Sequence, residues 1–187
     1  MRRTRKQDTR AILIILIAAI LLAFLCDILI TCVEKVIYPK NYYDEVMEYS
    51  SKYAVPAELV FAVIKVESDF DKDAKSHAGA LGLMQMIPST YKWLAEYHLG
   101  EIAITEMLYE PSTNIKYGTY YLRYLHTRFG SWEKAIIAYN WGETNFASFI
   151  EEHGYTEGDY DSIPVRETRN YVIKVMQYWE KYENLYK

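Results

Sequence analysis

The chain has 187 residues, of which 51% are hydrophobic and 25% are charged, a balance that excludes a disordered tail and is typical of one globular domain. Five prolines, eight glycines and the lack of any segment repeating at a period of about 20 to 50 residues exclude collagen-like, low-complexity and solenoid architectures. The net charge is −4, and because residues 1–10 carry five basic side chains against Asp8 alone, the rest of the chain is acidic, which argues against a nucleic-acid partner.

An apolar segment follows the basic tail of residues 1–10. Residues 11–26 contain no charge, and the apolar run resumes after Asp27 and continues to Val33. This is about the 20 residues that a membrane-spanning helix needs, and an acid such as Asp27 costs about 2.5–3.5 kcal/mol at the centre of a span and less near its end. We therefore expect a transmembrane signal anchor over residues 11–33. The basic tail orients the amino terminus to the cytoplasm and exports the rest of the chain.

A cleavable signal peptide and a lipoprotein signal are the alternatives for this segment. A cleavage site needs small residues at the end of the apolar run, where Phe24, Leu25 and Cys26 stand instead. Leu25 also occupies the place before Cys26 where a lipoprotein signal has a small residue. Cys26 and Cys32 are the only cysteines and both belong to this segment, so the exported part cannot form an internal disulfide.

Helical signals recur after an expected juxtamembrane linker at residues 34–44, and convincing runs of alternating β-branched residues are absent. Prolines and glycines delimit the expected helices, which run from Pro56 to Ser68, from Pro88 to near Gly100, from Pro111 to Gly130, from Ser131 to Gly142 and from about Arg166 onward. Loops are expected at 69–81 and 143–164. The sequence predicts a mainly α domain over residues 45–187.

Glu67 is the chemically informative residue of the first of these helices. Val60, Val63 and Ile64 precede it at three- and four-residue spacings, so that a carboxyl group ends an apolar helix face. One interpretation is a helix-terminal acid that points into water. The other is a partly desolvated carboxyl, because burial raises the pKa of an acid to the range that a general acid needs near neutral pH.

Glu67 is accompanied by ordered motifs. Glu67-Ser68-Asp69-Phe70 precedes Ser76-His77-Ala78-Gly79-Ala80-Leu81-Gly82-Leu83-Met84-Gln85-Met86-Ile87-Pro88, and then come Asn114-Ile115 with Gly118, Ala138-Tyr139-Asn140 with Gly142, and Glu167-Thr168-Arg169-Asn170-Tyr171-Val172. Over about residues 45–182 the chain thereby resembles the catalytic domain of soluble-type lytic transglycosylases. These enzymes have a goose-type-lysozyme-like fold and cleave bacterial peptidoglycan.

The resemblance implies a role for each matching residue. Glu67 is the single catalytic acid, which protonates the glycosidic oxygen and later takes a proton from the attacking hydroxyl. That hydroxyl is the C6 hydroxyl of the substrate's own N-acetylmuramic acid (MurNAc), so the product carries a 1,6-anhydro ring and no water, metal or cofactor is needed. The residues that the resemblance places at the substrate are Ser76, Gln85, Tyr139, Asn140, Glu167 and Tyr171.

Several of these residues also have a structural interpretation. Ser76 suits a turn, and Tyr139 and Asn140 suit a buried tyrosine with its hydroxyl satisfied and a helix-ending asparagine. Glu167 suits a first-turn acid that the helix dipole favours. Because Glu167 and Tyr171 are four residues apart, both can face the same side of the last helix.

An ordinary glycosidase needs a second carboxylate beside its acid. Asp69, Asp71 and Asp73 are close to Glu67 in sequence, but their loop, which also contains Lys72 and Lys75, is typical of a solvated turn. None of them matches a nucleophile of the family that the chain resembles. A departure from that family's pattern is Glu143 after Trp141-Gly142, where a small residue followed by glycine and proline is commoner. Because of this departure, the sequence does not predict which end of the substrate is preferred.

The sequence therefore predicts a membrane-anchored peptidoglycan lytic transglycosylase whose catalytic domain lies outside the cytoplasm in the bacterial cell envelope. Glycan strands, the membrane and a wall-associated protein assembly are its expected partners. The alternatives are a goose-type-lysozyme-like muramidase, which is a hydrolase, and a non-catalytic glycan-binding module of a wall-spanning assembly. The four histidines are too scattered to predict a metal site.

Overall fold

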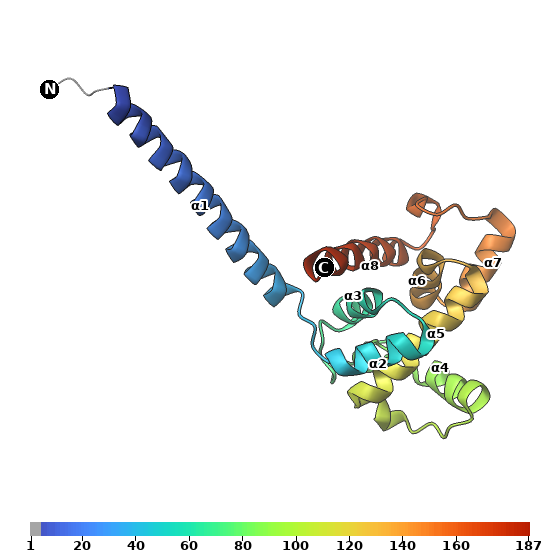
Figure 1. Ribbon diagram of the computed structural model, residues 1–187. Helices are drawn as coiled ribbons and strands as arrows, with labels where there is room; N and C mark the ends of the chain where they lie inside the picture. Colours follow the sequence, from blue (N-terminus) through green and yellow to red (C-terminus); the bar gives the residue numbers. More distant parts are fainter. Residues whose placement is uncertain (1–4) are drawn as a thin grey trace. The chain divides into compact units, whose positions relative to one another are not determined.

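The computed structural model describes residues 5–187, so the first four residues of the expected basic tail lie outside the described residues. The chain divides into two compact units at Pro39 and Lys40. The first unit is a single helix, α1 (Arg5–Ile37), drawn in blue in Figure 1. Its stretch Ile12–Ile37 is 26 residues long and its side chains are exposed. At about 1.5 Å per residue it is long enough to cross a bilayer core of about 30 Å.

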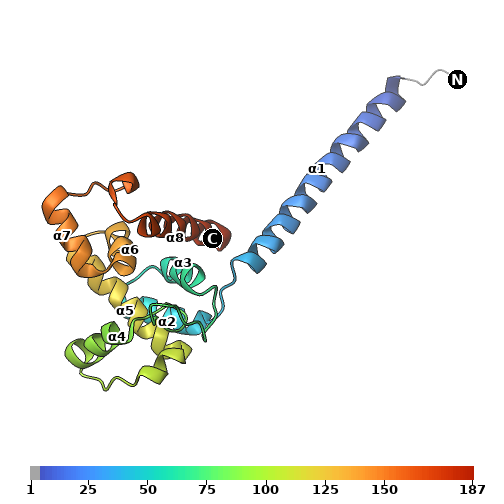
Figure 2. The ribbon, with the colours of Figure 1, turned by 180° about the vertical axis from the view of Figure 1, so that it is seen from behind.

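The second unit is helical. Figures 1 and 2 show its helices, which are α2 (Tyr43–Tyr53), α3 (Ala57–Glu67), α4 (Pro88–Trp93), the π-helix η1 (Leu94–Leu99), the 3-10 helix η2 (Thr105–Tyr109), α5 (Pro111–Phe129), α6 (Trp132–Trp141), α7 (Glu143–His153), the 3-10 helix η3 (Tyr160–Ser162) and α8 (Arg166–Leu185). The described residues form no strand, only isolated β-bridges of Leu81 with Lys75 and with Met86. The prediction of a mainly α domain is confirmed.

Helix α3 forms the centre of this unit. All six residues from Leu59 to Ile64 are buried, because the helix is apolar on every side and packs against both α2 and α8. Figures 1 and 2 show α3 between these two helices. Burial on all sides fixes the position of Glu67, the last residue of α3.

The expected helix ends are largely those of the structure. Pro88 and Pro111 are the first residues of α4 and α5, and Gly130 ends α5 with a φ of 81°. The Ser131 hydroxyl accepts a hydrogen bond of 3.2 Å from the backbone N–H of Lys134 at the start of α6. These are the positions where proline, left-handed glycine and serine stabilise helix ends.

One expectation is wrong. The loop expected at 143–164 contains α7 in its first half, because Gly142, with a φ of 94°, ends α6 and at once begins α7. Phe146 is fully buried in α7, where its ring centroid lies 5.2 Å from that of Phe129. The stretch expected as a linker, residues 34–44, contains the end of α1 at Ile37 and the start of α2 at Tyr43.

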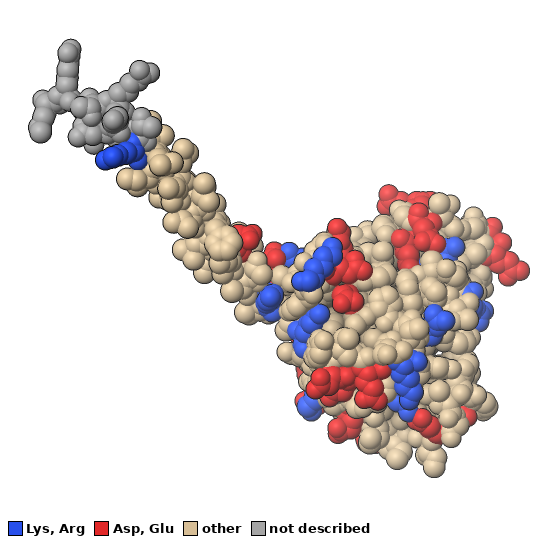
Figure 3. All heavy atoms as spheres, viewed as in Figure 1, with Lys and Arg blue, Asp and Glu red and all other residues tan. Residues whose placement is uncertain are grey.

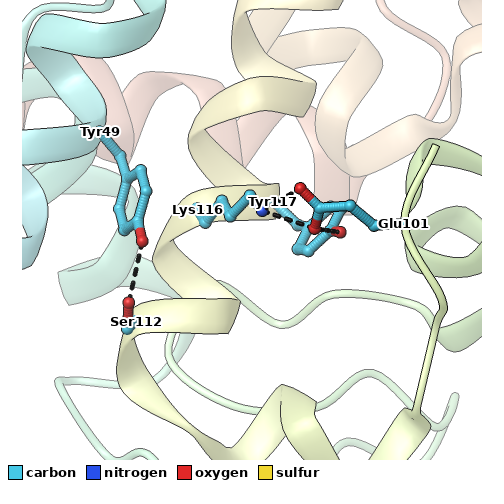
Figure 4. Close-up of polar contacts among 5 residues, drawn as sticks. All are labelled: Tyr49, Glu101, Ser112, Lys116 and Tyr117. Atoms are coloured by element: carbon cyan, nitrogen blue, oxygen red, sulfur yellow. Dashed lines mark hydrogen bonds and ion pairs between the residues drawn. The ribbon is translucent and has the colours of Figure 1, made fainter. Parts of the chain in front are cut away.

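Polar contacts fasten the segment between η1 and η2 to α5 (Figure 4). The Lys116 ammonium donates hydrogen bonds of 2.5 and 2.6 Å to the Glu101 carboxylate, and the Tyr117 hydroxyl donates one of 2.6 Å. These donors lower the pKa of Glu101. A further hydrogen bond of 3.0 Å joins the Tyr49 hydroxyl of α2 to the Ser112 hydroxyl of α5. Helix α5 therefore holds this part of the unit together.

Candidate active site

Glu67 is a half-buried acid at the carboxyl end of α3. Its carboxylate accepts a hydrogen bond of 2.6 Å from the Tyr171 hydroxyl of α8. Burial raises the pKa of Glu67 to about 7, the negative charge of Glu167 also raises it, and the Tyr171 hydrogen bond opposes this by stabilising the ionised form. The interpretation of Glu67 as a desolvated carboxyl is confirmed, and a side chain pointing into open water is excluded.

A cavity of about 520 Å³, which we call the Glu67 hollow, opens at this carboxyl. Ser76 and Gln85, both expected at the substrate, line it. The remaining lining residues are Lys65, Val66, Ser68, Asp69, Ala74, Lys75, Lys174 and Tyr178. Three of these side chains are cationic, although the chain has 25 Asp and Glu residues against 21 Lys and Arg residues. Figure 3 shows both kinds of charge scattered over one face of the molecule.

Two further hollows adjoin the Glu67 hollow in series through shared lining residues, and we call the three hollows together the groove. The middle hollow, of about 170 Å³, shares Gln85 with the Glu67 hollow and is also lined by Tyr139 and Asn140. The far hollow, of about 430 Å³, shares Tyr121 with the middle one and is also lined by Trp93. A series of hollows that begins at Glu67 suits an extended polymer.

Asn114 holds the backbone that carries Gln85. Its buried amide nitrogen donates hydrogen bonds of 2.8 Å to the Leu81 carbonyl and 2.7 Å to the Leu108 carbonyl, and its amide oxygen accepts one of 2.7 Å from the Met84 N–H. One helical turn further along α5, a Cβ atom at Gly118 would overlap the Met84 side chain. The family pattern at these two α5 positions therefore has a packing reason.

Gln85 is held in a conformation that is uncommon for a residue with a side chain. Its φ is 47°, in the left-handed region, and its side-chain amide donates hydrogen bonds of 2.9 Å to the Gly82 carbonyl and 3.2 Å to the Ala74 carbonyl. Gln85 therefore joins two loop segments at the junction of two hollows. The neighbouring Met84 and Met86 are buried in the core.

Tyr139 and Asn140 line the middle hollow from the end of α6. The Tyr139 hydroxyl donates a hydrogen bond of 2.8 Å to the Met84 carbonyl, and both burial and the nearby charge of Glu67 raise its pKa. The Asn140 amide oxygen accepts a hydrogen bond of 2.8 Å from the Thr168 hydroxyl of α8. Both side chains line the groove and also fasten its walls.

The two α8 residues expected at the substrate occupy different environments. Tyr171 is buried with its hydroxyl on Glu67 and, within the described residues, lines none of the three hollows. Glu167 is exposed, lines none of the three hollows within the described residues, and acts on Glu67 through its charge. Lys174 and Tyr178 continue the same helix face and line the Glu67 hollow. Lys174 is three residues after Tyr171, and Tyr178 is four residues after Lys174, a helical spacing that could have identified both.

The loop after Glu67 has the character of a solvated turn. The Asp71 carboxylate accepts a hydrogen bond of 2.9 Å from the Asp73 N–H, and the Lys72 ammonium lies 2.8 Å from the Asp73 carboxylate. Asp69 lines the Glu67 hollow but is exposed and ion-paired with Lys65. Over residues 5–187, no cluster of three or more metal-ligating side chains is found.

The fold and the site together define a lysozyme-like helical domain with a half-buried acid, Glu67, in the first of three adjoining hollows. Residues 44–161 match the family model described as the transglycosylase SLT domain, and the chain belongs to this family.

Named relatives and solved structures agree with this assignment. The chain is 32% identical over 149 residues to the soluble lytic murein transglycosylase of Escherichia coli K12, an alignment of 75% of this chain and 23% of the relative. It is 29% identical over 170 residues to the membrane-bound lytic murein transglycosylase C of Glaesserella parasuis, which covers 78% of this chain and 47% of that one. The crystal structure of an inactive variant of the lytic transglycosylase Slt of Pseudomonas aeruginosa matches with a TM-score of 0.74 and 30% identity, over 80% of this chain and 25% of that chain. The chain thus spans between about a quarter and a half of the length of these relatives.

Proposed function

We propose that this chain is a peptidoglycan lytic transglycosylase, which cuts the β-1,4 bond between MurNAc and N-acetylglucosamine and leaves 1,6-anhydro-MurNAc ends. The observation that carries the proposal is the position of Glu67, a half-buried acid with a pKa of about 7 at a groove. An acid with this pKa is present in both protonation states near neutral pH. It can therefore give a proton in one step and take one in the next.

The reaction needs only this one carboxyl. In the first step Glu67 gives its proton to the glycosidic oxygen as the bond from that oxygen to C1 of MurNAc breaks, and the N-acetylglucosamine side leaves as an alcohol. In the second step the Glu67 carboxylate takes the proton of the MurNAc C6 hydroxyl, whose oxygen bonds to C1. The 1,6-anhydro ring closes and Glu67 is again protonated. No water is consumed, so no second carboxylate is needed.

The surrounding side chains support this assignment. Tyr171 is buried and its hydroxyl donates to Glu67, which makes it a positioning residue. Ser76, Gln85 and Asn140 supply polar groups along the groove, as hydroxyl-rich sugars require. Asp69, the other carboxylate at the Glu67 hollow, is exposed and paired with Lys65, which makes it a poor nucleophile. This favours anhydro-ring formation over the hydrolysis of a goose-type muramidase.

The test is a digestion of purified sacculi by the full chain in detergent, with the products separated by mass. The proposal expects ends that are lighter by one water than hydrolysis products, and loss of cleavage in Glu67→Gln. Glu58→Gln, at the first turn of the same helix, is the matched control and keeps its activity. Products of hydrolytic mass would identify a muramidase, and equal cleavage by wild type and Glu67→Gln would remove Glu67 from the chemistry.

We also propose that α1 anchors the enzyme in a single pass, with residues 40–187 on the outer side of the membrane. The length and exposed apolar surface of Ile12–Ile37 support the span, and the basic residues before it support the orientation. Membrane-bound relatives fit a location in the cell envelope. Protease added to intact spheroplasts should remove the domain. Protection of the domain from the protease would indicate the opposite orientation and contradict the proposal.

A further inference from the structure

The Glu67 hollow contains cations that the reaction does not use. Lys75 comes from the loop after α3 and Lys174 from α8, so they approach the hollow from two different elements. Neither has a carboxylate within ion-pair distance among the described residues, whereas Lys65 in the same hollow is paired with Asp69. Two unpaired cations at one hollow of an acidic chain point to an anionic ligand.

Both lysine side chains are exposed at the hollow. The backbone of Lys75 is in a β-bridge with Leu81, and the Lys174 ammonium lies 5.5 Å from the centre of the Tyr178 ring. The pKa of Glu67 is raised by burial and by the charge of Glu167 and is lowered by the Tyr171 hydrogen bond, so its shift is explained by other groups.

The glycan backbone itself is neutral, so it gives these cations no partner. The charged groups nearest the scissile bond are carried by the 3-O-lactyl arm of MurNAc, which ends in a free carboxylate or continues into a peptide stem that has carboxylates of its own. We propose that Lys75 and Lys174 bind a carboxylate of the peptide stem, so that the enzyme prefers stem-bearing strands. This inference rests on the proposed function and adds the substrate form that the site selects.

The experiment compares three substrates made from the same strands, using the full chain in detergent at low salt. One substrate keeps its stems, the second has its carboxyl groups converted to amides by carbodiimide and ammonia, and the third has its stems removed, which leaves free lactyl carboxylates. The variants are Lys75→Gln, Lys174→Gln and the double substitution. Lys52→Gln, an exposed lysine on α2 with the same charge change, is the matched control.

We expect each lysine substitution to raise KM for stem-bearing strands by about two- to fivefold, the range of exposed ion pairs, with kcat changed less than twofold. The amidated strands should show no such change, and Lys174→Arg should restore the wild-type KM. Salt should weaken the wild-type preference because the pairs are solvent-accessible.

Three results would overturn the inference. Equal losses on amidated and stem-bearing strands would mean that the lysines act through the structure. No loss on either substrate would remove them from binding, and a lysine effect confined to the stem-free strands would assign the carboxylate to the lactyl group. Cleavage of the amidated strands by the wild type would leave the proposed function intact in each case, whereas no cleavage of any substrate would contradict that function instead.

Discussion

The Tyr171 hydroxyl donates a hydrogen bond of 2.6 Å to the Glu67 carboxylate, although the two residues are 104 positions apart in the chain. The contact joins the end of α3 to the second turn of α8, two helices that pack along each other. It stabilises the ionised form of Glu67 against the burial that favours the protonated form. Tyr171 therefore orients the acid and partly offsets the rise in its pKa that burial causes.

Tyr171→Phe should raise the pKa of Glu67 further, because the substitution removes the one contact that lowers it. The alkaline limb of the pH–rate profile should move to higher pH, and kcat near neutral pH should fall about tenfold as the carboxyl loses its fixed orientation. The measurement is cleavage of sacculi over a range of pH. Tyr120→Phe, which removes a hydroxyl from α5 outside the groove, is the control, and an unmoved alkaline limb in Tyr171→Phe would contradict the role.

The wild-type enzyme should lose activity in alkaline solution. Glu67 must carry a proton to begin the reaction, and with a pKa of about 7 the protonated fraction falls tenfold for each pH unit above that value. Hence kcat/KM should decline above about pH 7 and fall steeply by pH 9. Initial rates measured from pH 5 to 9 in one mixed buffer check this, and a flat profile would exclude Glu67 as the proton donor.

Most helices of the second unit could be predicted because local signals mark their ends. Pro88, Pro111, Gly130 and Ser131 act through their own backbone or side-chain chemistry, which a sequence displays directly. Helix α7 escaped prediction because Gly142 ends one helix and begins the next without an intervening loop. A glycine normally predicts only the first of these events.

Some features of the candidate site could likewise be predicted from the sequence, and others could not. The apolar face that ends at Glu67 indicated a desolvated acid, since helical spacing alone places the residues of that face together. The hydrogen bond from Tyr171, the groove shared with Trp93 and the unpaired lysines depend on contacts between distant segments. Such contacts leave no periodic signal in one sequence. The sequence does show that Tyr171 and Lys174 are three residues apart, which places them on one face of α8.

Asn114→Ala should destabilise the domain and its groove together. The substitution leaves the Leu81 and Leu108 carbonyls and the Met84 N–H without their buried partner. We expect the free energy of unfolding to fall by about 3 kcal/mol or more, and kcat to fall because the segment carrying Gln85 is released. Denaturant unfolding and sacculus cleavage measure the two effects. Asn184→Ala, at the exposed end of α8, should change neither, and wild-type stability in Asn114→Ala would show that the amide is dispensable.

Trp93→Leu should weaken binding of long glycan strands more than that of short ones. Trp93 lines the far hollow, which shares no lining residue with the Glu67 hollow, so we expect it to contact sugars other than those at the cut. Loss of an aromatic surface there should raise KM for long strands by about three- to tenfold, with kcat preserved. Trp132→Leu, which removes an indole that contacts His126 outside the groove, is the control. Equal KM increases for short and long strands would place Trp93 outside an extended binding site.

Glu67→Gln should gain stability relative to the wild type as the pH rises above neutral. In the unfolded chain this carboxyl has its ordinary pKa of 4.5, while in the folded domain its pKa is about 7. The folded state therefore binds more protons between these values, so wild-type stability declines as pH rises from 4.5 to 7 and stays lower at higher pH. Glutamine does not titrate, so the stability of the variant lacks this pH dependence. Between pH 4 and pH 8 the difference in free energy of unfolding between variant and wild type should therefore shift in favour of the variant by about 1–3 kcal/mol.

Thermal unfolding of both full-length proteins in detergent, followed by near-ultraviolet circular dichroism, measures this gap. Glu58→Gln, which removes a carboxyl from the first turn of the same helix, is the matched control. A constant difference between Glu67→Gln and wild type from pH 4 to 8 would mean that Glu67 titrates normally in the folded protein. The desolvated acid on which the mechanism depends would then be absent.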